Sequence, residues 1–170
     1  MAIREIVTLP APVLRRKARK VTTFGPDLQN LIDDMVETMR AAPGVGLAAN
    51  QVDVPLRVIV VEYGDEEDEE APKKLFTLVN PEITRPSEDM TVATEACLSI
   101  PGYVGDVERH EAITVKALNR FGKPQRVKAE GWLARIFQHE IDHLDGVLYI
   151  DRAEKVWKLE EADAQVVPAD

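Results

Sequence analysis

Hydrophobic positions in the first half of the chain follow two different periods. Between Pro26 and Arg40 the apolar residues recur at helical spacing, Pro26 suits a first helical turn, and Pro43-Gly44 closes the segment. The segment from Arg57 to Tyr63 is instead a dense run rich in β-branched residues, which predicts a strand. A second strand is predicted from Leu75 to Val79, ending at Asn80-Pro81.

Shorter apolar or alternating runs follow, and they predict further strands at Val104 to Val107, Ile113 to Leu118 and Gln125 to Ala129. Asn119 to Pro124 is predicted as the turn between the last two. A helix is predicted from about Trp132 to Leu144, and a last short helix from about Glu154 to Ala162. Strands gathered before a late helix predict an α+β fold, with mostly antiparallel sheet packed around the helix at Trp132 to Leu144.

Composition agrees with one globular domain over residues 1–170. Hydrophobic residues make up 45% of the chain and charged residues 30%, and no apolar run approaches the roughly 20 residues of a membrane span. The N-terminal region lacks the features of a signal peptide, so we expect a cytoplasmic location; an organellar protein trimmed of its transit peptide would look the same. The single cysteine excludes an intramolecular disulfide and fits a reducing compartment.

Charge is unevenly distributed along the chain. The net charge of -9 argues against a DNA-binding or other nucleic-acid-binding module. The run from Asp65 to Glu70 is entirely acidic and is expected to be a solvated loop without a catalytic role. The first twenty residues are basic, with six cations at Arg4, Arg15, Arg16, Lys17, Arg19 and Lys20.

The segment from His139 to His143 reads His-Glu-Ile-Asp-His, an HExxH pattern within the late predicted helix. Two histidines at i and i+4 share one helix face about 6 Å apart, so both can bind one metal ion. Glu140 points about 100° away around the helix axis, which suits a base acting on water better than a third ligand. Gly146 is a plausible helix stop.

A catalytic metal site of this kind needs a third protein ligand. A His-x-x-Gly-x-x-His continuation is excluded because Tyr149 stands at the last position. Cys97, His110 or a distal carboxylate such as Glu160 or Glu161 remains. We favour Cys97 because thiolate is a strong soft ligand and because the stretch from Glu95 to Gly102 is too irregular for a plain strand. His110 is interpreted as an ordinary surface histidine.

A third stretch, Gly44 to Gln51, reads Gly-Val-Gly-Leu-Ala-Ala-Asn-Gln. Its small residues let the backbone approach a ligand closely, and Gln51 offers a neutral amide donor that can polarise a carbonyl oxygen. Taken alone, such a stretch is more often a turn.

Together the three stretches, Gly44 to Gln51, Glu95 to Ser99 and Gln138 to His143, resemble in order and spacing the signature motifs of the peptide deformylases. The resemblance spans nearly the whole chain. It implies a hydrolase that removes the formyl group from the initiator methionine of nascent polypeptides and releases formate. It also implies a divalent metal, usually Fe²⁺, with Zn²⁺ or Ni²⁺ able to replace it, held by Cys97, His139 and His143.

The resemblance also implies roles for other residues. Glu140 would carry a proton to the departing amine, while the Gln51 side chain and the Leu98 backbone N–H would bind the oxyanion. Gly46 would place its backbone against the substrate peptide. Helical spacing puts Trp132 and Ile136 on the face of His139, so these two, with Val45, are candidates for an apolar methionine slot, although core packing would explain them equally well.

Two features depart from the family pattern. Ala96 stands where the family normally has glycine; if φ there were positive, alanine would cost about 1–2 kcal/mol, yet we expect activity to be retained, at an equal or lower rate. The C-terminal segment is acidic, whereas family members that dock on the ribosome are thought to use a basic C-terminal helix. The basic N-terminal segment is therefore the better candidate for a transient ribosome contact.

Two alternatives stay open at this point. A zincin-like endopeptidase would take Glu160 or Glu161 as third ligand. A deformylase-like binding protein would have lost turnover through Ala96, but the presence of Glu140 and Gln51 favours an enzyme.

Overall fold

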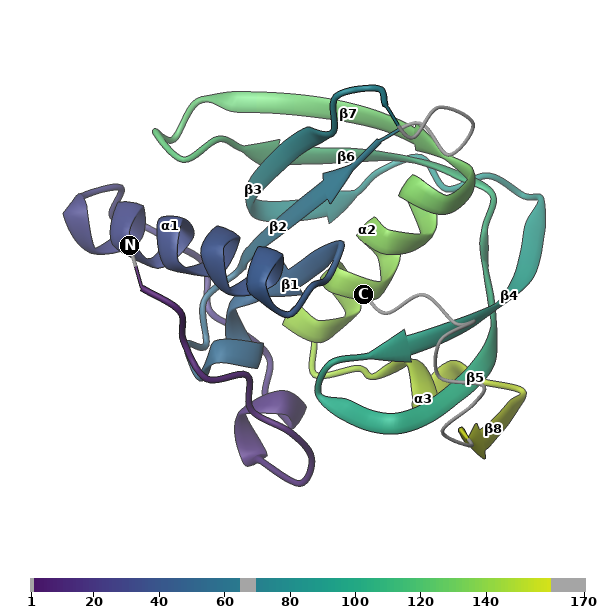
Figure 1. The fold of residues 1–170 in the computed structure, drawn as a ribbon. Coiled ribbons are helices and arrows are strands. Elements are labelled where there is room, and N and C mark those ends of the chain that lie inside the picture. Colours follow the sequence, from purple (N-terminus) through teal and green to yellow (C-terminus); the bar gives the residue numbers. More distant parts are fainter. Residues whose placement is uncertain (1, 65–69, 160–170) are drawn as a thin grey trace.

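The computed structural model describes residues 2–64 and 70–159, so most of the acidic run lies outside the described residues. Two antiparallel sheets enclose a long helix (Figure 1). The larger sheet has the strand order β1 (Gly46–Ala48), β2 (Val58–Tyr63), β3 (Lys74–Ile83), β6 (Ala112–Leu118) and β7 (Pro124–Glu130). The smaller sheet is formed by β4 (Met90–Cys97), β5 (Ile100–His110) and β8 (Lys155–Lys158).

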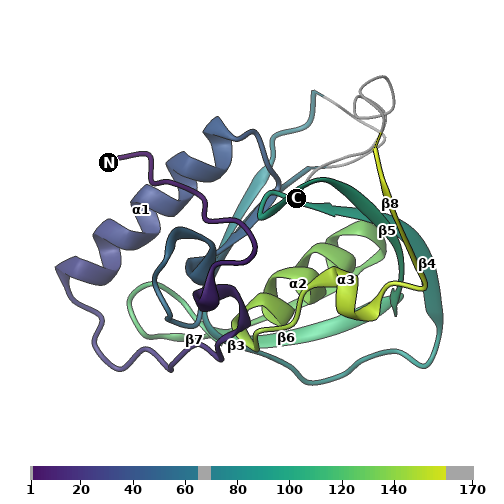
Figure 2. The same cartoon turned by 90° about the horizontal axis from the view of Figure 1, so that it is seen from below.

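Helices cover both faces of the larger sheet. The helices of the described chain are α1 (Pro26–Ala41), α2 (Gly131–Leu144) and α3 (Tyr149–Arg152), with short 3₁₀ turns η1 (Pro12–Arg15) and η2 (Ala49–Val52). Alternation along β2 explains the layering, because Val58 and Val60 belong to the apolar cluster under α1 whereas Ile59 and Val61 belong to the cluster under α2. Figure 2 shows α2 between the curved smaller sheet and the larger one.

Burial on all sides distinguishes α2 from an ordinary surface helix. Every residue from 134 to 141 is buried, and Phe137 packs edge-to-face on Phe76 with ring centroids 5.2 Å apart. The helix ends at Leu144, after which Gly146 adopts φ 75° and its N–H donates to the His143 carbonyl. A side chain enclosed in this way is screened from water and held in one place.

Most predicted elements are confirmed within one or two residues. The helices at Pro26 to Arg40 and Trp132 to Leu144, the strands at 57–63, 113–118 and 125–129, and the turn at 119–124 all appear near their expected bounds. The strand predicted at Val104 to Val107 is the middle of the longer β5. The α+β class with antiparallel sheets around the histidine-bearing helix is also confirmed.

One prediction about a strand boundary was wrong. The strand at Leu75 to Val79 does not end at Asn80-Pro81; β3 continues to Ile83 through a shift in pairing between Val79 and Glu82. Asn80, with φ 52°, absorbs the irregularity, and its side chain bonds the backbone of Val21. The irregular backbone expected from Glu95 to Gly102 is present: β4 runs as far as Cys97, but its pairing with β5 shifts between Ala96 and Cys97, a turn follows at Leu98-Ser99, and Gly102 has a φ of 85°.

The prediction of a last helix from Glu154 to Ala162 was also wrong in the part that the structure describes, residues 154–159. Lys155 to Lys158 form β8, which pairs with residues 103–106 of β5. The edge of β5 supplies backbone hydrogen-bond partners along this segment, which favours a strand over a helix here. Residues 160–162 lie outside the described part of the chain. Among the described residues, no helix is both long and apolar enough to cross a membrane.

We predict that Gly146→Ala destabilises the protein more than Gly102→Ala. Both glycines have positive φ, which costs alanine about 1–2 kcal/mol. A Cβ at Gly146 would also lie 2.7 Å from the Arg15 carbonyl oxygen, whereas at Gly102 it would meet nothing within 4 Å. Urea unfolding of the two variants measures the difference, and equal losses would contradict this account of the helix end.

Candidate metal centre

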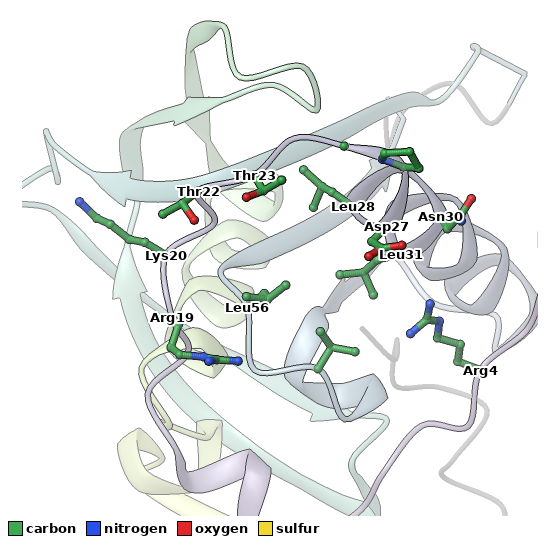
Figure 3. Close-up of a pocket in the computed structure, with 13 residues that line it drawn as sticks. Arg4, Arg19, Lys20, Thr22, Thr23, Asp27, Leu28, Asn30, Leu31 and Leu56 are labelled. Carbon is green, nitrogen blue, oxygen red and sulfur yellow. The ribbon is translucent and has the colours of Figure 1, made fainter.

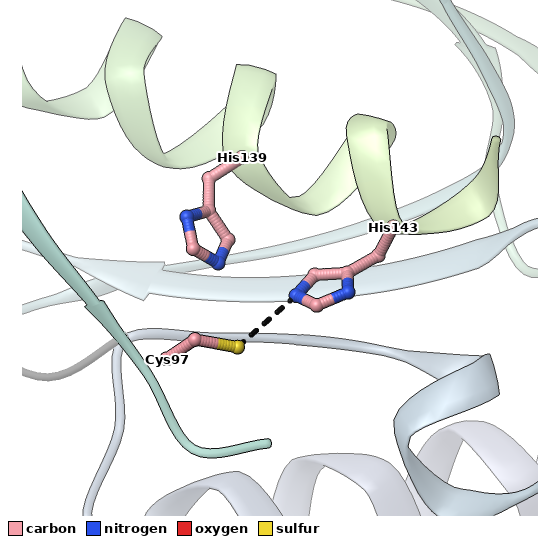
Figure 4. A group of neighbouring side chains, drawn as sticks. All are labelled: Cys97, His139 and His143. Atoms are coloured by element: carbon pink, nitrogen blue, oxygen red, sulfur yellow. Dashed lines mark hydrogen bonds between the residues drawn. The ribbon is translucent and has the colours of Figure 1, made fainter. Parts of the chain in front are cut away.

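Three side chains from two distant parts of the chain converge between the sheets. His139 and His143 project from one face of α2, and Cys97 reaches toward them from the end of β4 (Figure 4). All three are buried, and one ligand atom from each lies within 4.8 Å of the others. The Cys97 Sγ and the His143 Nε2 are 3.4 Å apart.

This donor set fits one small divalent ion. Metal–sulfur and metal–nitrogen bonds of about 2.3 and 2.1 Å in a tetrahedron put the two donor atoms roughly 3.6 Å apart. The Cys97–His143 separation of 3.4 Å is close to that value. Two imidazoles and a thiolate are three protein ligands, which leaves a fourth position for water or substrate. These residues form the metal site of the protein.

Glu95 holds His139 in the orientation that a ligand needs. Its Oε1 accepts a hydrogen bond of 2.9 Å from the His139 Nδ1, so Nε2 is the nitrogen left to face the metal. Burial by itself would raise the pKa of the Glu95 carboxyl, but hydrogen bonds from Arg109 and His139 outweigh burial and hold that pKa well below its usual value. Glu95 is therefore a permanent anion behind the metal ligand.

Two buried arginines neutralise this carboxylate. Arg109 binds both oxygens of Glu95 at 2.9 and 2.8 Å, and Arg135 binds one of them at 2.6 Å. Arg109 also donates to Asp142 at 2.6 Å, and Asp142 pairs in turn with Arg152 near the surface. Burial alone would lower the pKa of Arg109, but the bond to Glu95 and the charge of Asp142 raise it. Opposite charges are thus paired throughout the network.

Glu140 lies fully buried beside the backbone of β1. A Cβ placed on Gly46 would come within 2.6 Å of the Glu140 Oε2. Gly46 was expected to bring its backbone against a substrate, but this contact shows that the missing side chain also makes room for the glutamate. Glycine is therefore needed at position 46 because a side chain there would collide with Glu140.

Gln51 reaches the same centre from η2. Its Oε1 accepts a hydrogen bond of 3.0 Å from the Ala48 N–H, which fixes which end of the amide is nitrogen. The Nε2 lies 3.1 Å from the Ser99 Oγ and 3.7 Å from the Cys97 Sγ. Leu98 lies in the turn directly after Cys97, so its backbone is next to the metal ligand in sequence.

Ala96 does not have the backbone conformation that would demand glycine. Among the described residues other than glycine, only Asp53 and Asn80 have positive φ. Ala96 sits in β4 and pairs with Val104 of β5, next to a shift in pairing between Ala96 and Cys97, and without a positive φ its backbone accepts any side chain. The departure from the family pattern therefore causes no backbone strain beside Cys97.

The residues predicted to line an apolar slot share one cluster. Ile136 is a buried member of the core under α2, while Val45 and Trp132 are half-buried and pack against that core. The guanidinium carbon of Arg135 lies 5.9 Å from the centre of the Trp132 ring. The three side chains thus belong to the apolar surface that surrounds the metal helix.

Among the other ligand candidates, His110 lies in the described part of the chain and does not join the cluster. His110 is half-buried rather than a surface residue, and its Nδ1 lies 2.8 Å from the Ser87 carbonyl oxygen. It is not part of the metal-binding group. Glu160 and Glu161 lie outside the described residues, and Cys97 supplies the third ligand.

The sequence analysis missed the supporting role of Glu95, Arg109, Arg135 and Ser99. A signal existed for Glu95, because side chains at i and i+2 of a strand share one face, which puts Glu95 beside Cys97. That signal depended on recognising β4. Asn50, which donates to the His143 carbonyl oxygen, had no comparable signal.

A separate cavity of about 850 Å³ lies away from the metal ligands, between the N-terminal segment and the start of α1. Figure 3 shows Arg19 and Lys20 on one side of it, Arg4 on another, and Leu28, Leu31 and Leu56 among its apolar lining. None of the metal-site residues lines this cavity.

A cysteine from a strand joins two buried histidines and a glutamate from a helix between two antiparallel sheets, and this arrangement defines a metal-dependent hydrolase. A family model described as polypeptide deformylase matches residues 3–158. The chain belongs to the peptide deformylase family, whose activity is removal of the N-formyl group from nascent peptides.

Individual relatives agree along most of the chain. The peptide deformylase of Symbiobacterium thermophilum is 57% identical over 152 residues, covering 89% of this chain and 67% of its own length. The peptide deformylase of Dehalococcoides mccartyi (strain CBDB1) is 49% identical, and the match covers 95% of this chain and 92% of the relative's length. The crystal structure of the Thermotoga maritima peptide deformylase superposes with a TM-score of 0.84 at 39% sequence identity. The match covers 91% of this chain and 100% of the Thermotoga maritima chain.

We predict that Gly46→Ala lowers kcat by about 100-fold, because the new methyl group displaces the Glu140 carboxylate. A displacement near 1 Å at a reacting centre lowers the rate by about that factor. The added methyl collides with the Glu140 carboxylate, and the nearest atoms are all from that residue, so metal content should stay unchanged. Gly25→Ala is the matched control, since its Cβ would meet nothing closer than 3.9 Å. A Gly46→Ala enzyme with parental kcat would contradict the close approach.

Proposed function

We propose that this chain deformylates N-formylmethionyl peptides with Glu140 as the proton carrier, and with Gln51 and Leu98 as oxyanion donors. The observation that carries the proposal is the burial of Glu140 against Gly46, in the helical turn between the two histidine ligands. Residues 1–170 act as one catalytic domain in this proposal, supported by the family match over residues 3–158.

The bound metal supplies Lewis acidity, which lowers the pKa of water at this site toward neutrality. Glu140 accepts the proton that water releases on attacking the formyl carbon, and then delivers it to the amine that departs. A carboxylate suits both steps because one group acts first as base and then as acid. The products are formate and a peptide with a free α-amine.

Negative charge develops on the formyl oxygen during the attack. The Gln51 Nε2 is an uncharged donor within 3.7 Å of the thiolate ligand, which supports its role as a donor to that oxygen. The Leu98 N–H follows Cys97 directly, which supports it as a second donor. Gln51 lies in η2 and Leu98 in the turn after β4, so both donors belong to residues of ordered segments.

Substrate selection is proposed to use apolar surface at the start of α2. Val45, Trp132 and Ile136 all pack in or on the cluster that surrounds the metal helix. Because the three side chains belong to one apolar cluster, they support a binding pocket for the unbranched methionine side chain. Gly46 is proposed to present its backbone to the peptide as well as admitting Glu140.

The native metal is proposed to be Fe²⁺, with Zn²⁺ or Ni²⁺ able to substitute. Imidazole and thiolate suit all three ions, so the donor set supports the choice without deciding it. A thiolate ligand on ferrous iron is expected to make the enzyme sensitive to oxygen. The cytoplasm, or an organelle after removal of a transit peptide, is the proposed location.

Glu140→Gln tests the mechanism by formate release from formyl-Met-Ala-Ser, with protein loaded anaerobically with Fe²⁺, Zn²⁺ or Ni²⁺. The variant keeps the size of the side chain but cannot carry the proton, so kcat should fall by roughly 10²- to 10⁴-fold at unchanged metal content. A metal-replete parent that releases no formate would refute the proposed activity.

Ala96→Gly belongs in the same assay. Because Ala96 lies in β4 without a positive φ, the glycine variant should release formate at a comparable rate. It should also be less stable by about 0.5–1 kcal/mol, since glycine weakens a strand. A silent parent restored by glycine would instead identify Ala96 as a residue that disables turnover.

A transient ribosome contact is proposed through the basic N-terminal segment. Its cations Arg15, Arg16, Lys17, Arg19 and Lys20 are all exposed in a protein of net charge -9. Arg15 also pairs with Asp151 at 2.5 Å, so its charge is partly matched. Arg19 and Lys20 border the cavity of Figure 3, which extends the basic surface toward α1.

Co-sedimentation with ribosomes tests this contact. Neutralising Arg15, Arg16 and Lys17 should weaken binding and flatten its dependence on salt, because fewer phosphate charges are matched. Neutralising the exposed lysines Lys73, Lys116 and Lys128 is the control for net charge alone. Equal effects of the two triple variants would exclude a specific role for the N-terminal segment.

A further inference from the structure

The hydroxyl of Ser99 occupies a position that controls the amide of Gln51. Ser99 and Gln51 are both fully buried, with no exposed surface, and the Gln51 Nε2 donates to the Ser99 Oγ at 3.1 Å. At the other end of the same amide, the Ala48 N–H donates to Oε1 at 3.0 Å. One backbone donor and one hydroxyl acceptor therefore fix both ends of the side chain.

An amide nitrogen carries two N–H bonds about 120° apart in one plane. When Ser99 accepts one of them, the direction of the other is set. That second direction is toward the metal ligands, since the Nε2 also lies 3.7 Å from the Cys97 Sγ. Without the hydroxyl, the amide could rotate about its terminal torsion, which is broad for glutamine.

The backbones that carry the two residues are also joined. The Val7 N–H donates to the Gln51 carbonyl oxygen at 2.8 Å, and the Leu9 N–H donates to the Ser99 carbonyl oxygen at 3.0 Å. The N-terminal segment thus bridges η2 and the turn between β4 and β5. This bridge keeps the hydroxyl within hydrogen-bonding distance of the amide.

From this geometry we propose that Ser99 is a positioning residue, which orients the Gln51 amide so that one N–H points into the metal site. Ser99 touches neither metal nor substrate in this role and acts through Gln51. The inference rests on the proposed function of Gln51 as an oxyanion donor. It accounts for a buried serine that the proposed mechanism otherwise leaves without a part.

A double-mutant cycle tests the inference with zinc-loaded protein and formyl-Met-Ala-Ser. Ser99→Ala should lower kcat about 10-fold with little change in KM, because the oriented N–H matters most in the transition state. In a Gln51→Ala background the same serine substitution should change kcat less than about twofold. If Gln51→Ala does not fold, Gln51→Met supplies the second background.

Ser87→Ala is the matched control, since this hydroxyl bonds the backbone of Asp89 and Ala112 and makes no contact with Gln51. A second readout is the side-chain amide signal of Gln51 in a ¹⁵N–¹H spectrum, assigned by its loss in the Gln51 variant. This signal should shift in Ser99→Ala and stay in place in Ser87→Ala. Metal content, measured for every variant, should remain equal.

The outcomes separate the two proposals. An equal loss of kcat for Ser99→Ala in both backgrounds, parental kcat in Ser99→Ala, or reduced metal content would overturn the positioning role and leave the role of Gln51 intact. A Gln51 variant with parental kcat would overturn the oxyanion role itself, and the inference about Ser99 with it.

Discussion

The hydrogen bond between Glu95 and His139 is the interaction on which the arrangement of this site depends. It joins a strand of the smaller sheet to the helix between the sheets, and it selects the imidazole nitrogen that faces the metal. A carboxylate buried at that position requires compensation, which Arg109 and Arg135 provide from β5 and α2. The charged network is therefore a consequence of using a histidine ligand deep inside the fold.

The layered architecture serves the same requirement. Because β2 carries apolar side chains on both faces, α1 can cover the outer face of the larger sheet and leave the inner face to α2. The smaller sheet then brings Glu95 and Cys97 against α2 from the opposite side. All three donor residues are buried, and electrostatic interactions are stronger away from water.

Sequence reasoning predicted the helices and central strands because their periodicity is strong, and it predicted the metal ligands because HExxH spacing has few other uses. It was right that the backbone around Pro101-Gly102 is irregular, since Gly102 has a φ of 85° and the pairing of β4 with β5 shifts between Ala96 and Cys97. It did not predict that strands lie on both sides of this irregularity. The structure places those two residues inside β5, after a turn as short as two residues. Glu95, Arg109 and Ser99 could not be assigned roles without that hairpin, because their partners lie on other elements. β8 was mistaken for a helix because its backbone partners belong to a strand fifty residues earlier in the chain.

The division of the ligands between β4 and α2 also has a consequence for biosynthesis. Cys97 is translated before His139 and His143, which lie on α2 further along the chain. Neither the thiol nor the histidine pair alone supplies the three protein ligands of the site. The two sheets must pack around α2 before Cys97 faces the histidines. Metal capture must therefore wait until translation has passed α2, so that Cys97 spends the earlier part of synthesis without its partner ligands.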